Sequence, residues 1–97
     1  MNIKRIADGD SLVIMIEGRI DTNTSPDFEK EIENLDGVSD LTLDFKDVAY
    51  ISSAGLRVLL KAQKKMMVHG EMKLINVNDY VMDVLVVTGF SDILTIE

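Results

Sequence analysis

The chain has 97 residues, 46% of them hydrophobic, a formal net charge of −7 and no cysteine. This length and hydrophobic content predict one folded domain over residues 1–97 rather than a disordered chain. The acidic balance argues against a nucleic-acid partner, since phosphates favour a basic face, and the lack of cysteine excludes disulfides and thiol chemistry.

The N-terminal part of the chain predicts a β-hairpin. Asn2 to Ile6 forms a short first strand, and Ser11 to Gly18 (SLVIMIEG) is rich in branched apolar residues, which favour strands. Between them, Asp8-Gly9-Asp10 is typical of a tight turn. The two strands are therefore expected to pair antiparallel.

A first helix is predicted to begin at Thr24 or Ser25, because Pro26 follows and proline suits the first helical turn. Phe28, Ile32 and Leu35 have the i, i+4, i+7 spacing of a helix with one buried face. Asp36-Gly37 is expected to end the helix.

The stretch Leu41–Leu60 changes from strand to helix character. Leu41, Leu43 and Phe45 alternate, whereas Leu56, Leu59 and Leu60 follow helical spacing. The joint between them is Ile51–Gly55 (ISSAG). We expect a strand at Leu41–Phe45 and a second helix from about Ser53 to about His69, with Gly70 as its natural stop.

The C-terminal part predicts a strand at Glu71–Val77, a short helix over Tyr80–Thr88 after the capping signal Asn78-Asp79, and a last strand within Phe90–Glu97, most clearly at Ile93–Ile96. Strands that alternate with helices predict an α/β fold. The expected architecture is a mostly parallel sheet with an antiparallel N-terminal strand and helices packed against it.

Ser53 is a candidate functional residue because it stands where a strand gives way to a helix. A serine there can cap the helix, and the free N–H groups and helix dipole also favour an anion such as a covalent phosphate. Serine hydrolase chemistry is disfavoured, because the only imidazole, His69, is expected at the other end of the same helix, about 24 Å away.

Asp21, Asp44 and Asp47 form the second candidate set. Asp21 follows the second strand, so it is expected near the same end of the sheet as the Ser52-Ser53 loop. It can hold a turn or accept a hydrogen bond from a partner. Three scattered carboxylates are a poor cage for Mg²⁺, and the glycine-rich phosphate-binding motifs are absent. We therefore expect no metal and no cofactor.

Three motifs carry a resemblance to a known family: Gly18–Asp21 (GRID), Leu43–Val48 (LDFKDV) and Tyr50–Leu56 (YISSAGL). They resemble the STAS-domain family, and within it the bacterial anti-sigma-factor antagonists. Gly18–Asp21 (GRID) is similar to the family's G-x-[IL]-D, and Leu43–Val48 to its central strand and turn. Tyr50–Leu56 (YISSAGL) is similar to the signature [YF]-[MI]-D-S-[SA]-G-L. Gly70–Met72 fits the end of the second helix.

The resemblance implies a protein switch rather than an enzyme. Ser53 matches the serine that a cognate kinase phosphorylates, and the partner surface implied includes Asp21, Ser52, Ser53, Ala54, Gly55 and Arg57. Unphosphorylated, such a domain binds an anti-sigma factor with serine kinase activity and frees the sigma factor; phosphorylation dissociates the complex and a phosphatase can reset it. No nucleic acid or small-molecule cofactor is implied.

One departure from the family keeps alternatives open. Ser52 stands where the family usually has Asp, so the acidic neighbour that can orient the serine is missing. One alternative is phosphorylation on Ser52. Another is a STAS binding module that is not phosphorylated and belongs to a larger signalling or lipid-transport complex. A small enzyme that uses Ser53 is disfavoured, because the chain lacks a base placed to activate it. No apolar run is long enough to span a bilayer, and with no signal peptide we expect a cytoplasmic protein.

Overall fold

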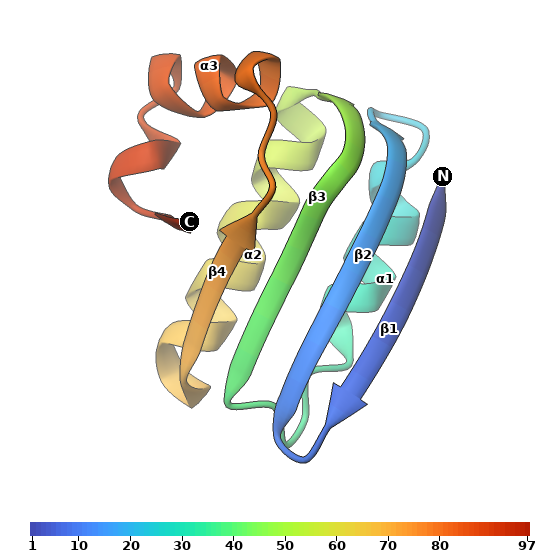
Figure 1. The fold of residues 1–97 in the computed structure, drawn as a ribbon, viewed down its shortest axis with the longest axis vertical. Coiled ribbons are helices and arrows are strands. Elements are labelled where there is room, and N and C mark those ends of the chain that lie inside the picture. Colours follow the sequence, from blue (N-terminus) through green and yellow to red (C-terminus); the bar gives the residue numbers. More distant parts are fainter.

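A computed structural model describes all 97 residues and contains one five-stranded sheet with the strand order β1-β2-β3-β4-β5 (Figure 1). The strands are β1 (Asn2–Asp8), β2 (Ser11–Ile20), β3 (Asp40–Ile51), β4 (Glu71–Ile75) and β5 (Thr95–Ile96). The helices are α1 (Ser25–Glu33), α2 (Ser53–His69) and α3 (Asp79–Val87), with a 3-10 turn η1 at Phe90–Asp92.

β1 and β2 form the predicted antiparallel hairpin, and all other neighbouring strands pair parallel. Asp8 pairs with Ser11 across a two-residue turn in which Gly9 has a φ of 62°, a conformation that favours glycine. The predicted fold class, a mostly parallel sheet with an antiparallel N-terminal strand, is confirmed.

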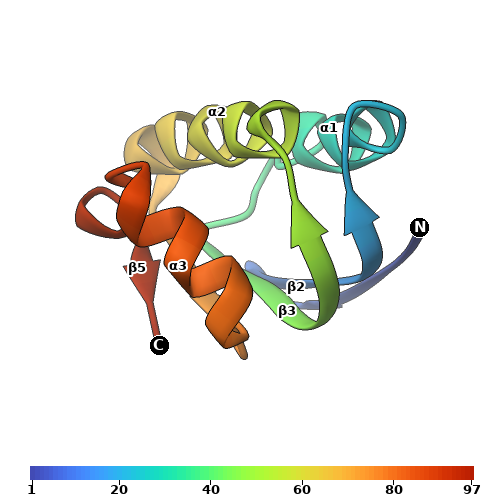
Figure 2. The same ribbon diagram turned by 90° about the horizontal axis from the view of Figure 1, so that it is seen from above.

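The helices lie where their apolar stripes require. α1 and α2 run side by side over one face of the sheet, and α3 lies across the end of the sheet at which β3 finishes (Figures 1 and 2). Alternate residues of β2, namely Leu12, Ile14 and Ile16, belong with Leu59 and Met66 of α2 to one hydrophobic cluster of 22 buried residues. This single cluster fixes the position of α2, and with it the position of Ser53.

Helix α1 is shorter than predicted. It ends at Glu33, with Asn34 as its C-terminal cap, so Asp36-Gly37 lies beyond the end of the helix. Leu35 is nevertheless buried, because the loop that follows α1 turns it into the core. The i+7 residue of the predicted stripe is thus a core residue without being helical.

Strand β3 is longer than predicted, since it continues past Phe45 to Ile51. Its pairing with β2 shifts twice, and each time β3 has one residue more than β2. Such bulges break the inside–outside alternation, and Lys46 and Asp47 are both exposed as a result. The strand was predicted from the alternation of apolar and polar residues, and the bulges interrupt that alternation after Phe45, so the last part of the strand was not predicted.

The C-terminal third also differs in detail. β4 stops at Ile75 rather than Val77, because Asn76 adopts a positive φ of 59° and turns the chain. The Asn78 side chain caps α3 as predicted, accepting a hydrogen bond from the N–H of Val81 at 2.8 Å. The last strand is confined to Thr95–Ile96 because η1 occupies the residues after Gly89.

Candidate functional site

The loops after β2 and β3 lie together at one end of the sheet, the end seen from above in Figure 2. Ile20 and Ile51 are paired residues at the ends of the two strands. The N–H of Ser52 donates a 2.8 Å hydrogen bond to the carbonyl oxygen of Ile20. The predicted proximity of Asp21 and the Ser52-Ser53 loop is therefore confirmed.

The two serines at the start of α2 have different surroundings. Ser52 is the N-cap: its Oγ accepts a hydrogen bond from the N–H of Gly55 at 3.4 Å, and its carbonyl accepts from Leu56 at 2.9 Å. Ser53 is the first helical residue and is exposed. Ser52, and not Ser53, supplies the capping hydroxyl, which leaves the Ser53 hydroxyl free of intramolecular hydrogen bonds.

The first turn of α2 favours an anion beside Ser53. The first N–H groups of a helix lack partners within the helix. Ser52 accepts from the N–H groups of Gly55 and Leu56, which leaves those of Ser53 and Ala54 without a hydrogen bond. No acidic residue occupies this turn. Arg57 lies four residues after Ser53, so the two share a helix face; Arg57 is exposed and no carboxylate pairs with it.

A shallow depression runs from this turn toward α1. Ala54 and Arg57 line it on the α2 side, together with Val58, and the α1 side is formed by Ser25, Pro26 and Glu29. Glu29 also forms an ion pair with Lys61 of α2 at 2.9 Å, which joins the two helices. The predicted residues Ala54 and Arg57 therefore belong to one surface that begins at Ser53.

Gly55 shapes this surface from below. It is buried, and a Cβ atom there would lie 2.6 Å from Cγ2 of Ile20 and 2.8 Å from Cγ1 of Ile51. Only a residue without a side chain lets α2 start this close to the ends of both strands. Gly55, predicted as part of the partner surface, thus positions Ser53 and is not itself at the surface.

Asp21 organises the loop between β2 and α1. Its Oδ1 accepts hydrogen bonds from the N–H groups of Asn23 at 2.9 Å and Thr24 at 3.0 Å. The pKa of Asp21 is held below its usual range, chiefly by the hydrogen bond from the Thr24 N–H and despite some desolvation. The Asn23 N–H, the Thr24 hydroxyl and the Arg19 guanidinium lower it further. Asp21 is therefore charged and holds the turn, which is one of the two roles expected for it.

Three side chains beside the Asp21 loop, those of Arg19, Tyr50 and Tyr80, form a row that was not predicted from the sequence. Arg19 lies over the ring of Tyr50, 4.3 Å from its centroid, and its Nε is 3.9 Å from Asp21 Oδ2. The ring of Tyr50 is 6.2 Å from that of Tyr80 on α3. Arg19 faces Tyr50 only because of the second bulge, where Gly18 has a φ of 109°; the glycine of the GRID motif was the one available signal.

The other candidate groups are not brought together. Asp44 accepts hydrogen bonds from the Lys46 N–H and the Asn76 side chain, and Asp47 pairs opposite Glu17 on the strand. No group of three or more His, Asp or Glu side chains is placed to hold a metal ion. His69 ends α2, at the opposite end from Ser53.

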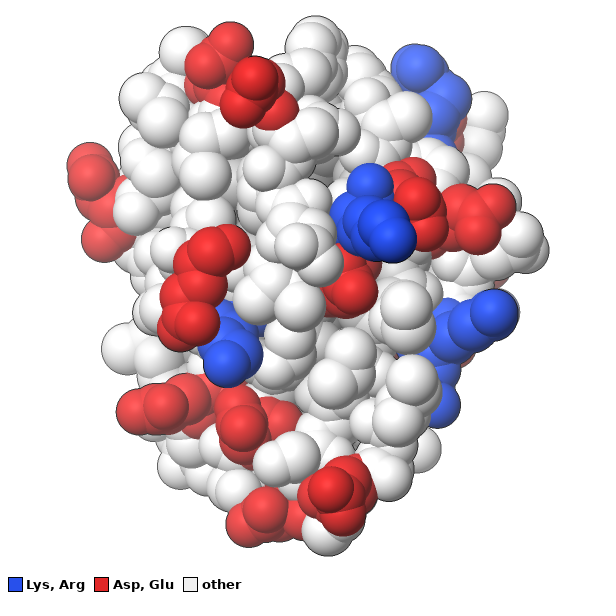
Figure 3. All heavy atoms as spheres, in the orientation of Figure 1, with Lys and Arg blue, Asp and Glu red and all other residues white.

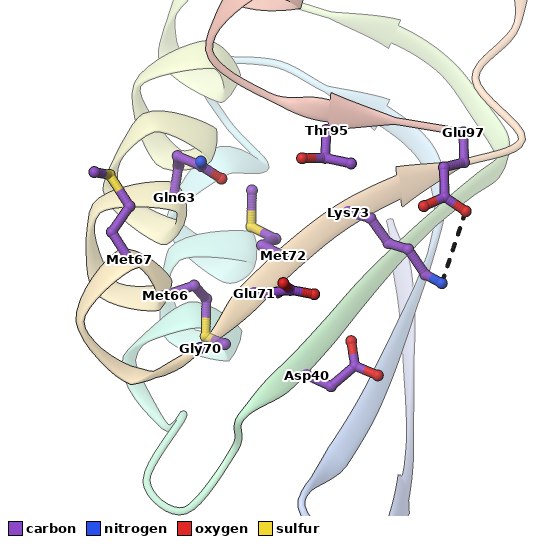
Figure 4. Close-up of a pocket in the computed structure, with 10 residues that line it drawn as sticks. All are labelled: Asp40, Gln63, Met66, Met67, Gly70, Glu71, Met72, Lys73, Thr95 and Glu97. Atoms are coloured by element: carbon purple, nitrogen blue, oxygen red, sulfur yellow. Dashed lines mark ion pairs between the residues drawn. The ribbon is translucent and has the colours of Figure 1, made fainter.

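The largest pocket, of about 360 Å³, lies at that opposite end (Figure 4). It is bordered by Asp40 and Glu71 at the starts of β3 and β4, and by Lys73, whose ammonium lies 3.8 Å from the carboxylate of Glu97. It shares no residue with the Ser53 surface. None of the helices combines the length and apolar character that a membrane span requires.

These features define a small α/β module with an exposed serine at a helix start beside an aspartate-held loop. The chain belongs to the STAS-domain family, whose model matches residues 2–97. The anti-sigma-B factor antagonist of Listeria monocytogenes is 31% identical over 94 residues, which cover 93% of this chain and 82% of that protein.

Two solved structures share the fold. A candidate anti-sigma factor antagonist from Thermotoga maritima superposes with a TM-score of 0.89 at 22% identity, covering 97% of this chain and 84% of that one. The Bacillus cell fate determinant SpoIIAA in its phosphorylated form has a TM-score of 0.75 at 16% identity, covering 99% of this chain and 91% of that one.

Proposed function

We propose that this chain is an anti-sigma-factor antagonist that acts by partner switching. In its unmodified form it binds an anti-sigma factor with serine kinase activity, which then phosphorylates Ser53 and releases it; a phosphatase resets the cycle. The observation that carries this proposal is the Ser53 hydroxyl, exposed and unbonded on the first turn of α2 beside the Asp21 loop.

The relatives support this class of function. The Listeria protein, at 31% identity, bears the name anti-sigma-B factor antagonist. SpoIIAA, which shares the fold, exists in a phosphorylated form. Partner exchange controlled by phosphorylation is therefore compatible with this architecture.

The local chemistry explains why phosphorylation changes binding more than folding. A phosphate adds about −1.5 to −2 charges and three acceptor oxygens. Within the chain, the free N–H groups of Ser53 and Ala54 and the unpaired Arg57 can stabilise it. At a protein contact the phosphate must also lose its water on the side that faces the partner, and this cost falls on binding alone.

Ser53 suits the kinase better than Ser52. The Ser52 hydroxyl is half-buried and already accepts the capping hydrogen bond of α2, so a kinase can reach it less easily than the exposed hydroxyl of Ser53. The main alternative, a STAS binding module that is never phosphorylated, is supported by the serine in place of the family's aspartate at position 52.

The test begins with the wild-type chain as bait in an extract of its source cell, followed by purification of the kinase-type protein identified by mass spectrometry. Ser53→Asp should bind that protein at least tenfold more weakly, a loss of about 1.4 kcal/mol in binding free energy. Its melting temperature should change little, because the helix dipole stabilises the added negative charge by about 0.3–1 kcal/mol. Ser53→Ala should bind and resist phosphorylation by the kinase and ATP.

Asn34→Asp is the matched control, since it adds one charge at an exposed position at the far end of α1. It should bind like the wild type. Phosphate found on Ser52 alone, no phosphate at all, or equal binding by Ser53→Asp and Asn34→Asp would contradict the proposal.

A further inference from the structure

Helix α3 has a second apolar strip beside its buried one, and the core covers this second strip only in part, at Val84. Val81 and Leu85 face the core and are fully buried. Tyr80, Val84 and Val87, spaced i, i+4 and i+7, line a groove on the outer side. Exposed apolar residues that lie next to one another make this side of the helix a candidate contact surface.

The exposure of this outer side is large. Val87 has 85% of its surface accessible and Tyr80 55%. Contiguous exposed apolar groups on a small protein mark an interaction site more often than chance. Asp83 lies among them on the groove, and in Figure 3 the surface over α3, at the upper left, shows acidic and uncharged atoms without basic ones.

The groove is continuous with the surface around Ser53. Tyr80 forms one wall of the groove and its ring is 6.2 Å from that of Tyr50. Tyr50 lies under the guanidinium of Arg19, which is 3.9 Å from Asp21. A protein that covers Asp21 and Ser53 therefore reaches α3 along an unbroken row of side chains.

We propose that the outer face of α3, formed by Tyr80, Val84 and Val87 with Asp83 beside them, is a second docking element for the kinase-type anti-sigma factor. This inference rests on the proposed function. The partner is expected to insert an apolar side chain into the groove and to place a Lys or Arg near Asp83. A second copy of this chain fits less well, because each copy has a net charge of −7 and an acidic groove margin.

The chain offers a matched pair of variants. Val87 on α3 and Val68 near the end of α2 are 85% and 82% exposed, but Val68 lies about 22 Å along α2 from Ser53. Val87→Asp should weaken binding to the purified kinase at least tenfold, whereas Val68→Asp should change it less than twofold. Both variants should keep the wild-type circular dichroism spectrum.

Phosphorylation kinetics add a second readout. Because α3 does not touch the reacting hydroxyl, Val87→Asp should raise KM for Ser53 phosphorylation and leave kcat unchanged. Asp83→Asn should weaken binding about threefold at low salt and have no effect at high salt, whereas Asp36→Asn, an exposed control at the other end of the sheet, should have no effect at either.

The outcomes separate the two proposals. If Ser53→Asp weakens binding but Val87→Asp and Val68→Asp bind alike, the α3 site is wrong and the switch stands. If no kinase-type protein binds the wild type, both are wrong. If light scattering finds a wild-type dimer that Val87→Asp converts to a monomer, a second copy covers α3 and the proposed occupant is wrong.

Discussion

The two ends of α2 are attached to the sheet in different ways. At the C-terminal end the closing hydrogen bonds are between backbone groups: the Gly70 N–H donates to the Met66 carbonyl at 2.6 Å within the helix, and the Glu71 N–H donates to the Ser39 carbonyl at 3.0 Å. At the N-terminal end Ser52 takes the backbone and capping bonds, and the next residue, Ser53, has a free hydroxyl.

Each end depends on a glycine, and the comparison shows how differently. A Cβ at Gly70 would overlap the backbone carbonyl of Ser39, whereas one at Gly55 would meet the side chains of Ile20 and Ile51. A backbone carbonyl paired in a sheet cannot move aside, but a side chain can change its rotamer at a cost. The C-terminal end is therefore built for rigidity, and the N-terminal end for holding Ser53 close to the Asp21 loop.

The largest expected effect is that of Gly70→Ala. Its φ of 163° is extended and open to any residue, so the cost arises from the overlap with Ser39 alone. We expect a loss of at least about 3 kcal/mol in the free energy of unfolding, measured by urea denaturation. A loss below about 1 kcal/mol would mean that the contact between Gly70, in the turn from α2 to β4, and Ser39, just before β3, is looser than the structure shows.

Gly55→Ala should cost less stability, about 1–3 kcal/mol, because Ile20 and Ile51 can repack. Unlike Gly70→Ala, it displaces the first turn of α2, so the folded variant should also bind the kinase more weakly. Binding measured at a temperature where both variants are fully folded separates the two effects. Equal affinities for the two variants would break the proposed difference between the ends.

The same comparison shows which parts of the molecule could be predicted from sequence. The range of α2 was predicted correctly, from Ser53 to His69, because a long apolar stripe and a terminal glycine are local signals. The extension of β3 to Ile51 was not, because two bulges interrupt the alternation at Lys46 and Asp47. Pairing with β2 decides such bulges, and pairing is not a local property.

For the site, proximity was predictable and individual roles were not. The parallel sheet alone places Asp21 near Ser52 and Ser53. Which serine caps α2 depends on the backbone of Ser52, whose φ of −96° and ψ of 176° suit an N-cap. The contact of Arg19 with Tyr50 depends on the second bulge, so no spacing rule could have found it.

Ser52→Ala tests the division of labour between the two serines. It removes the capping hydroxyl, and because the hydrogen bond to Gly55 is long at 3.4 Å, the loss should be about 0.5–1 kcal/mol, the lower part of the usual range. Ser53 should remain a substrate of the kinase, as intact mass after incubation with ATP would report. If Ser52→Ala folds normally but is no longer phosphorylated, the kinase modifies Ser52 and not Ser53.

The smallest effect concerns the pH dependence that Asp21 confers. Its pKa in the folded chain is lowered, chiefly by the Thr24 N–H, whereas in the unfolded chain an aspartate has a pKa of about 3.9. A lowered folded pKa contributes stability that is fully present above the unfolded value and is lost as the pH falls through the folded value. Asp21→Asn should therefore be less stable than the wild type at pH 7.

The difference between the two proteins should shrink as the pH falls below about 4, because the wild-type carboxyl is then protonated and no longer differs in charge from the amide. Urea midpoints of both proteins at pH 7, 5 and 3 measure it. Asp27→Asn, which changes an exposed acid in the first turn of α1, controls for the general effect of losing one charge. A gap between wild type and Asp21→Asn that stays constant down to pH 3 would show that the hydrogen bonds of this loop do not depend on the charge of Asp21.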